Sequence, residues 1–460
     1  MPSRMDVYAV GAYGYRNFGD DCYAAVLRGK LAAVWADSKI DFHGMDASPF
    51  SPDRHRAVVL GGGGLFCRYV AECGTDNLAY FLRYPAVMHL FEKKSYALAL
   101  GVQGPFAGQG LERLLPIIDQ MALRTVRDTE SARLLRAAGV RSPIQTCADL
   151  AYLLPAPARF QNSRKRKPVL GIVASQPDKN VVYPESLGFQ RRITEAIATL
   201  ERDFELRYIS FAHHADGWLP SSIVYDPDQP SAIENFLAEF RQIDVCLISR
   251  FHGVILSVLN EIPFVAIGAP GEKVERECAA LSHPFFLPYS SDAEEFSSAI
   301  RNVWAERETV EMQLSVKRPR RVKLAERNIE LLHAAEAAVS EKQITKTQSP
   351  HDTLVIWAAE DEFWDEARFN LEAFGPFDCL VPATSQLRSQ HVKRRFALPA
   401  GTLMHWAMMP NEIKNEIKKH YGNVVLCHAS SRTAPSHLVE LGKECGSDVR
   451  EYALWRNQCN

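Results

Sequence analysis

The sequence lacks long apolar runs, a signal-peptide pattern and cysteine pairs at the spacing of metal sites. No run of about 18 consecutive apolar residues occurs, so no transmembrane helix is predicted. The N-terminus enters a strand-like segment without an apolar leader, and we therefore expect a cytoplasmic protein. The ten cysteines are scattered along the chain, which favours buried free thiols in a reducing compartment. No metal site is predicted.

An excess of charge of either sign is also missing. Lysine and arginine number 53, aspartate and glutamate number 55, and the net charge is −2. Because no general positive field is available to meet phosphates, we expect no nucleic-acid partner. Any site for an anion must arise from a few cations gathered in one place.

The chain is long, and predicted strands alternate with predicted helices along it. Its 460 residues, 47% of them hydrophobic, are enough for two or three domains. Apolar strands alternate with helices and glycine corners through residues 1–160 and 168–340, which predicts two doubly wound α/β domains. Beyond a polar linker, four short strands with helices at 412–420 and 436–445 predict a small α/β module over residues 351–460.

The most informative stretch is residues 245–278, which predicts a strand, a polar corner, a short apolar helix, a second strand and a glycine-rich loop. In such a βαβ unit the strands are parallel, and their carboxyl ends share one edge of the sheet. Arg250 and His252 in the corner and Lys273 in the loop are therefore expected to face one crevice. The helix N-termini at this edge also favour a bound anion.

The first predicted strand ends in a long loop at residues 11–21 with three glycines. Glycine lets the backbone approach a ligand closely. Asp20 and Asp21 are expected to cap a helix that begins near Cys22. Two interpretations stay open for this loop, a flexible turn with a good cap or a ligand-binding corner that includes Asn17.

Two more corners follow predicted strands. Residues 61–64 are four consecutive glycines, which suit close approach of a ligand or of another chain segment. The run lacks the lysine of a P-loop and the spacing of a dinucleotide fingerprint, so NAD is not proposed. Gln103 lies in a later glycine-bounded corner. Arg127 and Asp128 follow a fourth strand, and the pair is either an internal ion pair that caps the next helix or a part of the site.

Together these motifs resemble the polysaccharide pyruvyl transferase family over about residues 5–340. The resemblance is carried by Asn17-Phe18-Gly19-Asp20-Asp21, the four glycines, Arg127-Asp128, Ser249-Arg250-Phe251-His252-Gly253, Ile262-Pro263 and the loop that ends in Lys273. One departure is Asp149-Leu150, where the family usually has Asp-Pro. The resemblance implies two Rossmann-like domains in a GT-B-like arrangement. It also implies transfer of the pyruvyl group of phosphoenolpyruvate to two hydroxyls of a sugar, with formation of a ketal and release of phosphate.

Under this resemblance Arg127 and Arg250 would clamp the carboxylate and phosphate of the donor, since guanidinium groups bind both in bidentate fashion. Lys273 would supply a point charge to the phosphate. The predicted substrate-binding set is completed by further residues of the same corners, namely Asn17, Gly62, Gly63 and Gln103.

His252 is the expected acid or base, because the pKa of an unperturbed imidazole lies near neutrality. Asp20 or Asp128 would orient or deprotonate the sugar hydroxyl. No cofactor is expected besides phosphoenolpyruvate as co-substrate.

The expected partners are phosphoenolpyruvate and a sugar or lipid-linked glycan acceptor. The resemblance also allows peripheral association with the inner face of the membrane. Four cations of a predicted helix at 311–340 present either a solvated face or a face for anionic lipid, namely Lys317, Arg318, Arg320 and Arg321.

Two other functions stay open. A glycosyltransferase of the GT-B type would hold a nucleotide sugar with the same helix N-termini, but it gives less reason for Arg127 and Arg250 in opposing domains. A non-catalytic carbohydrate-binding or assembly protein would use residues 351–460 for docking. No role is assigned to that module from the sequence.

Overall fold

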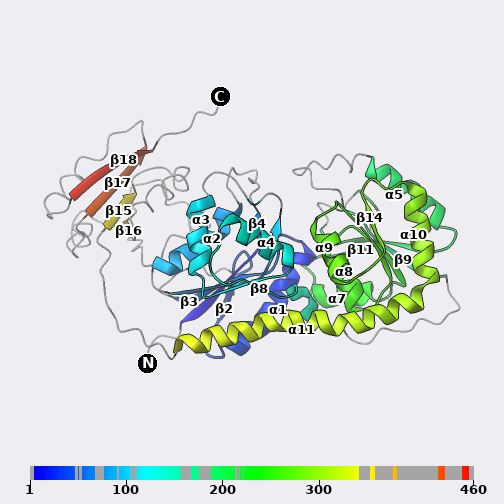
Figure 1. Cartoon of the computed structure of the whole chain (residues 1–460), viewed down its shortest axis with the longest axis horizontal. Coiled ribbons are helices and arrows are strands. Elements are labelled where there is room, and N and C mark those ends of the chain that lie inside the picture. Colours follow the sequence, from blue (N-terminus) through cyan, green and yellow to red (C-terminus); the bar gives the residue numbers. More distant parts are fainter. Residues whose placement is uncertain are drawn as a thin grey trace.

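The computed structural model describes most of the first 340 residues and four strands beyond them (Figure 1). The described residues are 5–46, 50, 54–67, 77–90, 93–103, 106, 111–156, 167–175, 188–212, 216, 218–220, 222–340, 353–357, 377–380, 423–429 and 448–454. They form two six-stranded sheets, one four-stranded sheet and one two-stranded sheet.

The first large sheet is parallel, with the strand order β2-β1-β3-β5-β7-β8. Its strands are β1 (Asp6–Val10), β2 (Ile40–Phe42), β3 (His55–Gly61), β5 (Lys94–Leu100), β7 (Leu123–Val126) and β8 (Gln145–Thr146). The chain winds outward in both directions from β1 and β3. The loops that leave these two strands therefore border the crevice at which such sheets bind ligands.

Helices cover both faces of this sheet, as each strand presents apolar side chains to both sides. One apolar cluster packs α2 (Asn77–Leu90), α3 (Leu111–Gln120) and α4 (Thr129–Ala138) against one face. The other face is covered by α1 (Phe18–Val34) and by the long C-terminal helix α11 (Arg307–Ser340). The short strands β4 (Phe66–Cys67) and β6 (Val102–Gln103) pair beside the crevice edge.

The second large sheet is also parallel, with the order β11-β10-β9-β12-β13-β14. Its strands are β9 (Val169–Val173), β10 (Glu205–Ser210), β11 (Ile223–Val224), β12 (Val245–Ile248), β13 (Phe264–Gly268) and β14 (Phe286–Pro288). This is the strand order of dinucleotide-binding folds, in which the crevice opens between the first and fourth strands of the unit. Here those strands are β9 and β12, so Arg250 directly follows the crevice strand.

The helices of the second sheet again form two layers. One face packs α5 (Phe189–Leu200) and α10 (Ala293–Ala305). The other carries α7 (Ala232–Phe240), α8 (Phe251–Leu259) and α9 (Lys273–Ala280). The prediction of two doubly wound parallel α/β sheets is confirmed.

The inner faces of the two sheets share one apolar cluster. Phe18 and Leu27 of α1 belong to the same buried cluster as Phe211 and Val254 of the second sheet. The connection between the sheets includes the 3₁₀ helix η1 (Leu150–Leu153). A large apolar contact of this kind holds domains in a fixed relation, whereas polar contacts leave them free to move.

Helix α11 runs along both halves of the molecule (Figure 1). Val310 and Leu314 are buried near its start, and Ala325, Ile329 and Leu332 are buried further along. At the junction, Glu277 of α9 accepts hydrogen bonds from Arg321 of α11 (2.7 Å) and from Tyr152 of η1 (2.5 Å). Three elements thus meet at one buried carboxylate.

The cations of α11 are largely used within the protein. Lys317 donates to the carbonyl of Ser282 (3.1 Å), and Arg318 pairs with Glu261 (3.0 Å). Arg321 is buried, and only Arg320 of the four is classed as exposed. Three of the four side chains thus contact the second domain, and the lipid-binding alternative stays a prediction.

The third sheet contains the four strands predicted for the C-terminal module. They are β15 (Thr353–Trp357), β16 (Phe377–Leu380), β17 (Asn423–Ala429) and β18 (Asp448–Leu454), in the parallel order β16-β15-β17-β18. The helices predicted at 412–420 and 436–445 lie outside the described residues. Among the described residues, none of the helices combines the length and apolar character needed to cross a membrane.

Candidate functional site

The start of α1 joins the two domains at the crevice. The backbone N–H of Phe18 donates to the carbonyl of Phe211 in the second domain (2.9 Å), and the two rings pack edge to face. Asp21 accepts a hydrogen bond from the hydroxyl of Tyr225 (3.1 Å). The loop that precedes α1 is therefore held between the domains rather than left flexible.

The cap of α1 differs from the sequence prediction. Asn17 is the N-cap, since its side chain accepts from the N–H of Gly19 (3.2 Å), and the helix begins at Phe18 rather than near Cys22. Asp20 and Asp21 lie in the first turn. An asparagine caps as well as an aspartate does. The earlier cap frees both carboxylates for other contacts.

Asp20 lies close to the cations of the crevice. The amide of Asn17 donates to one of its oxygens (2.6 Å). Burial raises the pKa of Asp20 to about 6, although Lys273, Arg250 and Arg127 pull it downward. A carboxylate with this pKa is ionised at neutral pH but can still take up a proton, which suits a general base.

The glycine run makes room for Tyr23 of α1. Gly62 has a φ of +75°, and a Cβ at this position would lie 2.6 Å from the Tyr23 ring. At Gly63 an added Cβ would lie 3.4 Å from the same ring and 3.5 Å from an oxygen of Asp20. Of the two alternatives for the run, approach of another chain segment is therefore seen at Gly62. An added Cβ at Gly64 would overlap with the amide of Gln103.

Arg127 is buried at the end of β7, with 3% of its side chain exposed. Its Nη1 donates to Asp149 (3.2 Å), and its guanidinium lies 4.3 Å from the centre of the Phe251 ring, a residue of the second domain. Its Nε is buried without a hydrogen-bond partner among the described residues. A Cβ on Gly101 would come within 2.6 Å of the guanidinium, so this corner must be glycine.

Arg250 is the N-cap residue of α8, and hydrogen bonds to Asp216 orient its guanidinium group. Its Nε (3.0 Å) and Nη2 (2.6 Å) both donate to the same oxygen of Asp216. The other oxygen of Asp216 accepts from the backbone N–H groups of Phe211 and Ala212. About a fifth of the Arg250 side chain, 22%, stays exposed. The guanidinium is thus fixed in place while part of it remains accessible.

Lys273 is the first residue of α9. Its side-chain ammonium forms no hydrogen bond with the part of the chain that the structure describes. Burial lowers its pKa, and Arg127 and Arg250 lower it further, while Asp20 opposes the shift. The two guanidinium groups therefore disfavour the charged form of Lys273, and a bound anion would offset that repulsion.

His252 is the second residue of α8, two positions after Arg250. Its Nε2 is 2.8 Å from the hydroxyl of Tyr23, and that hydroxyl donates to Asp149 (2.8 Å). A Cβ on Gly19 would overlap with Nδ1 of the imidazole. Burial lowers the pKa of His252 to about 3, and the cations Arg127, Lys273 and Arg250 add to the shift while Asp149 opposes it. The imidazole is therefore neutral in the unliganded protein.

The contacts of Asp128 cap a helix and form ion pairs within the protein. It is the N-cap of α4, where it accepts from the N–H of Ser131 (2.6 Å). It also forms ion pairs with Arg127 (3.9 Å) and with Arg276 of α9 (3.8 Å), which in turn donates to the carbonyl of Val102 (3.3 Å). Of the two alternatives left open by the sequence, this geometry favours the cap and ion pair.

The sequence analysis missed Tyr23, Asp216 and the aromatic partner Phe251, and it left Asp149 without a role. Tyr23 follows Gly19 by four positions, so both lie on one helical face. That spacing could have indicated it. Asp216 carries no such signal. The adjacent histidines at 213 and 214 lie outside the described residues.

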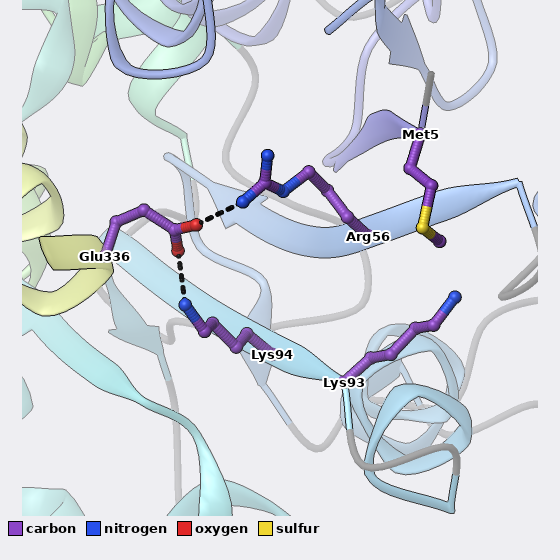
Figure 2. A pocket seen from close by; sticks show the side chains of 5 residues that line it. All are labelled: Met5, Arg56, Lys93, Lys94 and Glu336. Carbon is purple, nitrogen blue, oxygen red and sulfur yellow. Dashed lines mark hydrogen bonds and ion pairs between the residues drawn. The ribbon is translucent and has the colours of Figure 1, made fainter. Parts of the chain in front are cut away.

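A second basic cluster lines a pocket at the opposite, amino-terminal edge of the first sheet (Figure 2). Arg56, Lys93 and Lys94 line it together with Met5 and Glu336 of α11. Glu336 forms ion pairs with Arg56 (2.9 Å) and Lys94 (2.9 Å), as the dashed lines show. Glu336 also accepts from the hydroxyl of Tyr96.

The fold and the crevice define a two-domain α/β protein with buried or half-buried cations at the corner of each domain. No cluster of three or more metal-binding side chains occurs among the described residues. The chain belongs to the polysaccharide pyruvyl transferase family, whose model matches residues 17–269, more than half of the chain. The match begins at the cap of α1 and ends just after β13, so it includes both corners. The predicted membership is confirmed.

Solved structures give only distant likenesses. The spinosyn forosaminyltransferase SpnP is 14% identical, with a TM-score of 0.41, over 74% of this chain and 100% of that one. The spinosyn rhamnosyltransferase SpnG with thymidine diphosphate is 12% identical, with a TM-score of 0.36, over 73% and 99%. A functionally uncharacterised protein from Klebsiella pneumoniae is 12% identical, with a TM-score of 0.37, over 62% and 92%. Likenesses at this level establish no function.

Among curated proteins no match is found.

Proposed function

We propose that this protein transfers the pyruvyl group of phosphoenolpyruvate to two hydroxyls of a sugar, in a polysaccharide or its precursor, and releases phosphate. The observation that carries the proposal is a group of three cations contributed by both domains, namely Arg127, Arg250 and Lys273. All three lower the pKa values of Asp20 and of His252, so they lie near both groups. Family membership supports a pyruvyl transferase, and the charge of the crevice supports a small donor with more than one negative group.

The two arginines suit the two ends of such a donor. Asp149 and Asp216 hold their guanidinium groups from behind, so little side-chain entropy is lost when an anion binds. Arg127 keeps an unpartnered buried Nε among the described residues, and Arg250 keeps an accessible part. Carboxylate and phosphate are the groups that such forks bind best. Lys273 adds a cation with no competing hydrogen bond among the described residues.

The chemistry begins at the methylene carbon of the donor. A proton passes from protonated His252 to this carbon, the double bond supplies the electron pair, and an oxocarbenium centre forms at the neighbouring carbon. The first sugar hydroxyl attacks that centre, and its proton passes to a base. The carbon–oxygen bond to phosphate then breaks, the second hydroxyl attacks, and its proton leaves with the phosphate. The methyl group keeps the first proton, so the atoms balance.

The donor itself would prepare His252 for this step. Three cations hold the pKa of His252 down in the unliganded protein, together with burial. A bound anion among them offsets their field and raises this pKa, because a nearby negative charge favours the imidazolium form. Asp20, whose burial raises its pKa to about 6, is the base that we assign to the sugar hydroxyl.

We place the reaction in the cytoplasm, on a sugar or lipid-linked precursor of an exported glycan, as the family resemblance implies.

The proposed donor is tested by thermal unfolding of the purified protein with phosphoenolpyruvate and with a panel of nucleotide sugars. A donor at about a hundred times its Kd adds roughly 2.7 kcal/mol to the free energy of unfolding. Stabilisation by phosphoenolpyruvate, followed by acceptor-dependent phosphate release, supports the proposal. Stabilisation by a nucleotide sugar alone would replace it with glycosyl transfer.

A further inference from the structure

Three side chains from both domains form one buried hydrogen-bonded chain behind the crevice. Asp149 is fully buried and accepts from Tyr23 (2.8 Å), from Arg127 (3.2 Å) and from the N–H of Ala151 (2.9 Å). The Tyr23 hydroxyl is in turn 2.8 Å from Nε2 of His252. The rings of Tyr23 and His252 meet edge to face. Tyr23 thus connects a carboxylate of the first domain to the imidazole of the second.

Counting protons along this chain assigns the tautomer of the imidazole. A phenol has one proton, and the Asp149 carboxylate can only accept. Burial raises the pKa of Tyr23 far above its usual range, so the phenol keeps that proton. With the proton directed at Asp149, the phenol oxygen offers only lone pairs to His252. Nε2 must therefore carry a hydrogen, and in a neutral imidazole Nδ1 is then bare.

We propose that Tyr23 is a positioning residue that fixes His252 as the Nε2–H tautomer, so that Nδ1 is the nitrogen that gains and gives the proton in pyruvyl transfer. The inference rests on the proposed function for its catalytic part. Nδ1 faces the start of α1 beside Gly19, and the imidazole is only partly covered. In the transfer step the Nδ1–H bond breaks as the new C–H bond forms, and Nε2–H stays bonded to Tyr23 throughout.

The same chain also links His252 to the donor clamp. Asp149 orients Arg127 and, through Tyr23, His252. The group that binds the anion and the group that moves the proton therefore share one buried carboxylate. A substitution that removes only the phenol oxygen leaves Arg127 on Asp149, so donor binding and proton transfer can be separated by experiment.

The first experiment needs no activity. Nitrogen-15 spectra of histidine-labelled protein report which ring nitrogen carries the proton, and His252→Gln assigns the signal among the 14 histidines. We expect Nε2–H in the resting protein near neutral pH, and a mixture of tautomers in Tyr23→Phe. A wild-type signal for Nδ1–H would overturn the assignment, and this result does not depend on the folding or activity of Tyr23→Phe.

The second experiment is kinetic. Tyr23→Phe should lower kcat by about tenfold to a hundredfold, the range seen when the partner that orients a metal-binding histidine is removed, and leave the KM for phosphoenolpyruvate within about twofold. The matched control is Tyr225→Phe, which removes a phenol-to-carboxylate bond to Asp21 across the same domain boundary (3.1 Å) without touching His252. It should leave kcat unchanged.

The outcomes separate the two proposals. An active wild type with an unchanged kcat in Tyr23→Phe overturns the positioning role and leaves the proposed function standing. Equal loss in both tyrosine variants marks a general effect of the domain boundary and also overturns it. A wild type that transfers no pyruvyl group to any acceptor overturns the proposed function and the catalytic part of the inference together, while the nitrogen-15 spectra still decide the tautomer.

Discussion

The two basic clusters of the first sheet differ in how their cations are balanced. In the pocket at the amino-terminal edge, one carboxylate, Glu336, lies between Arg56 and Lys94 at 2.9 Å from each. In the crevice at the opposite edge, the carboxylates lie behind the arginines, and Lys273 has no hydrogen-bond partner among the described residues. Cations of the same kind therefore hold helix α11 at one edge, whereas we propose that they bind an anion at the other.

The shifts in pKa point the same way. Burial raises the pKa of Glu336, but hydrogen bonds from Tyr96 and Lys94 outweigh it and the net shift is downward. The neighbours of Glu336 thus stabilise its ionised form. In the crevice the pKa of Lys273 falls through burial and through repulsion by Arg127 and Arg250. A bound anion would offset this repulsion, and groups with perturbed pKa values are common at functional sites.

The largest expected effect comes from Arg250. Arg250→Ala should lower kcat/KM for phosphoenolpyruvate by about a hundredfold to a thousandfold, because truncating one partner of a buried charge pair costs about 2–5 kcal/mol. Steady-state phosphate release measures this, and Arg56→Ala is the matched control from the other cluster. Equal losses in the two variants would show that the clusters do not differ in function.

A smaller effect is expected at Gly19. A Cβ here would overlap with Nδ1 of His252, so Gly19→Ala should displace the imidazole from Tyr23 and lower kcat by about tenfold to a hundredfold. Stabilisation by phosphoenolpyruvate should persist, since the arginines are untouched.

The control for this change lies on the same helix. An added Cβ at Gly29 meets nothing within 4 Å, so Gly29→Ala should keep full activity and raise stability by about 0.5–1 kcal/mol. A wild-type kcat in Gly19→Ala would show that the imidazole tolerates displacement, which contradicts its assigned role.

The sequence predicted the crevice corners well, because strand order alone determines which strand ends meet. Arg250 and His252 follow β12, and Arg127 follows β7, so their placement at the crevice follows from parallel topology. What surrounds them could not be predicted in the same way. Asp216, which follows β10 in the sequence, reaches Arg250 through a tertiary contact, and the contact of Tyr23 with His252 depends on how one domain sits against the other. Asp216 has no spacing signal in the sequence, and the four-residue spacing of Gly19 and Tyr23 places them on one helical face without showing what that face contacts.

The cap of α1 was predicted wrongly for a related reason. Asn17, Asp20 and Asp21 are all good capping residues, and the choice among them depends on a tertiary contact, the bond from the Phe18 N–H to Phe211. A helix that starts at residue 18 brings Gly19 under the imidazole and Tyr23 one turn further on. Because the start of α1 was predicted wrongly, Tyr23 was not identified as the residue that connects the two domains.

The smallest expected effect tests the pocket. Glu336→Gln should lower the free energy of unfolding by about 1–2 kcal/mol at pH 7, through loss of charged hydrogen bonds from Arg56 and Lys94, and leave kcat/KM unchanged.

This loss of stability should depend on pH. Because the pKa of Glu336 is lowered in the folded protein, the unfolded chain takes up its proton first as the pH falls. The difference in stability between wild type and variant is therefore present above the ordinary glutamate pKa and shrinks as the pH falls through the folded value. Denaturant unfolding at pH 7 and pH 4 measures it, and a loss of activity instead of stability would assign the pocket a part in the reaction.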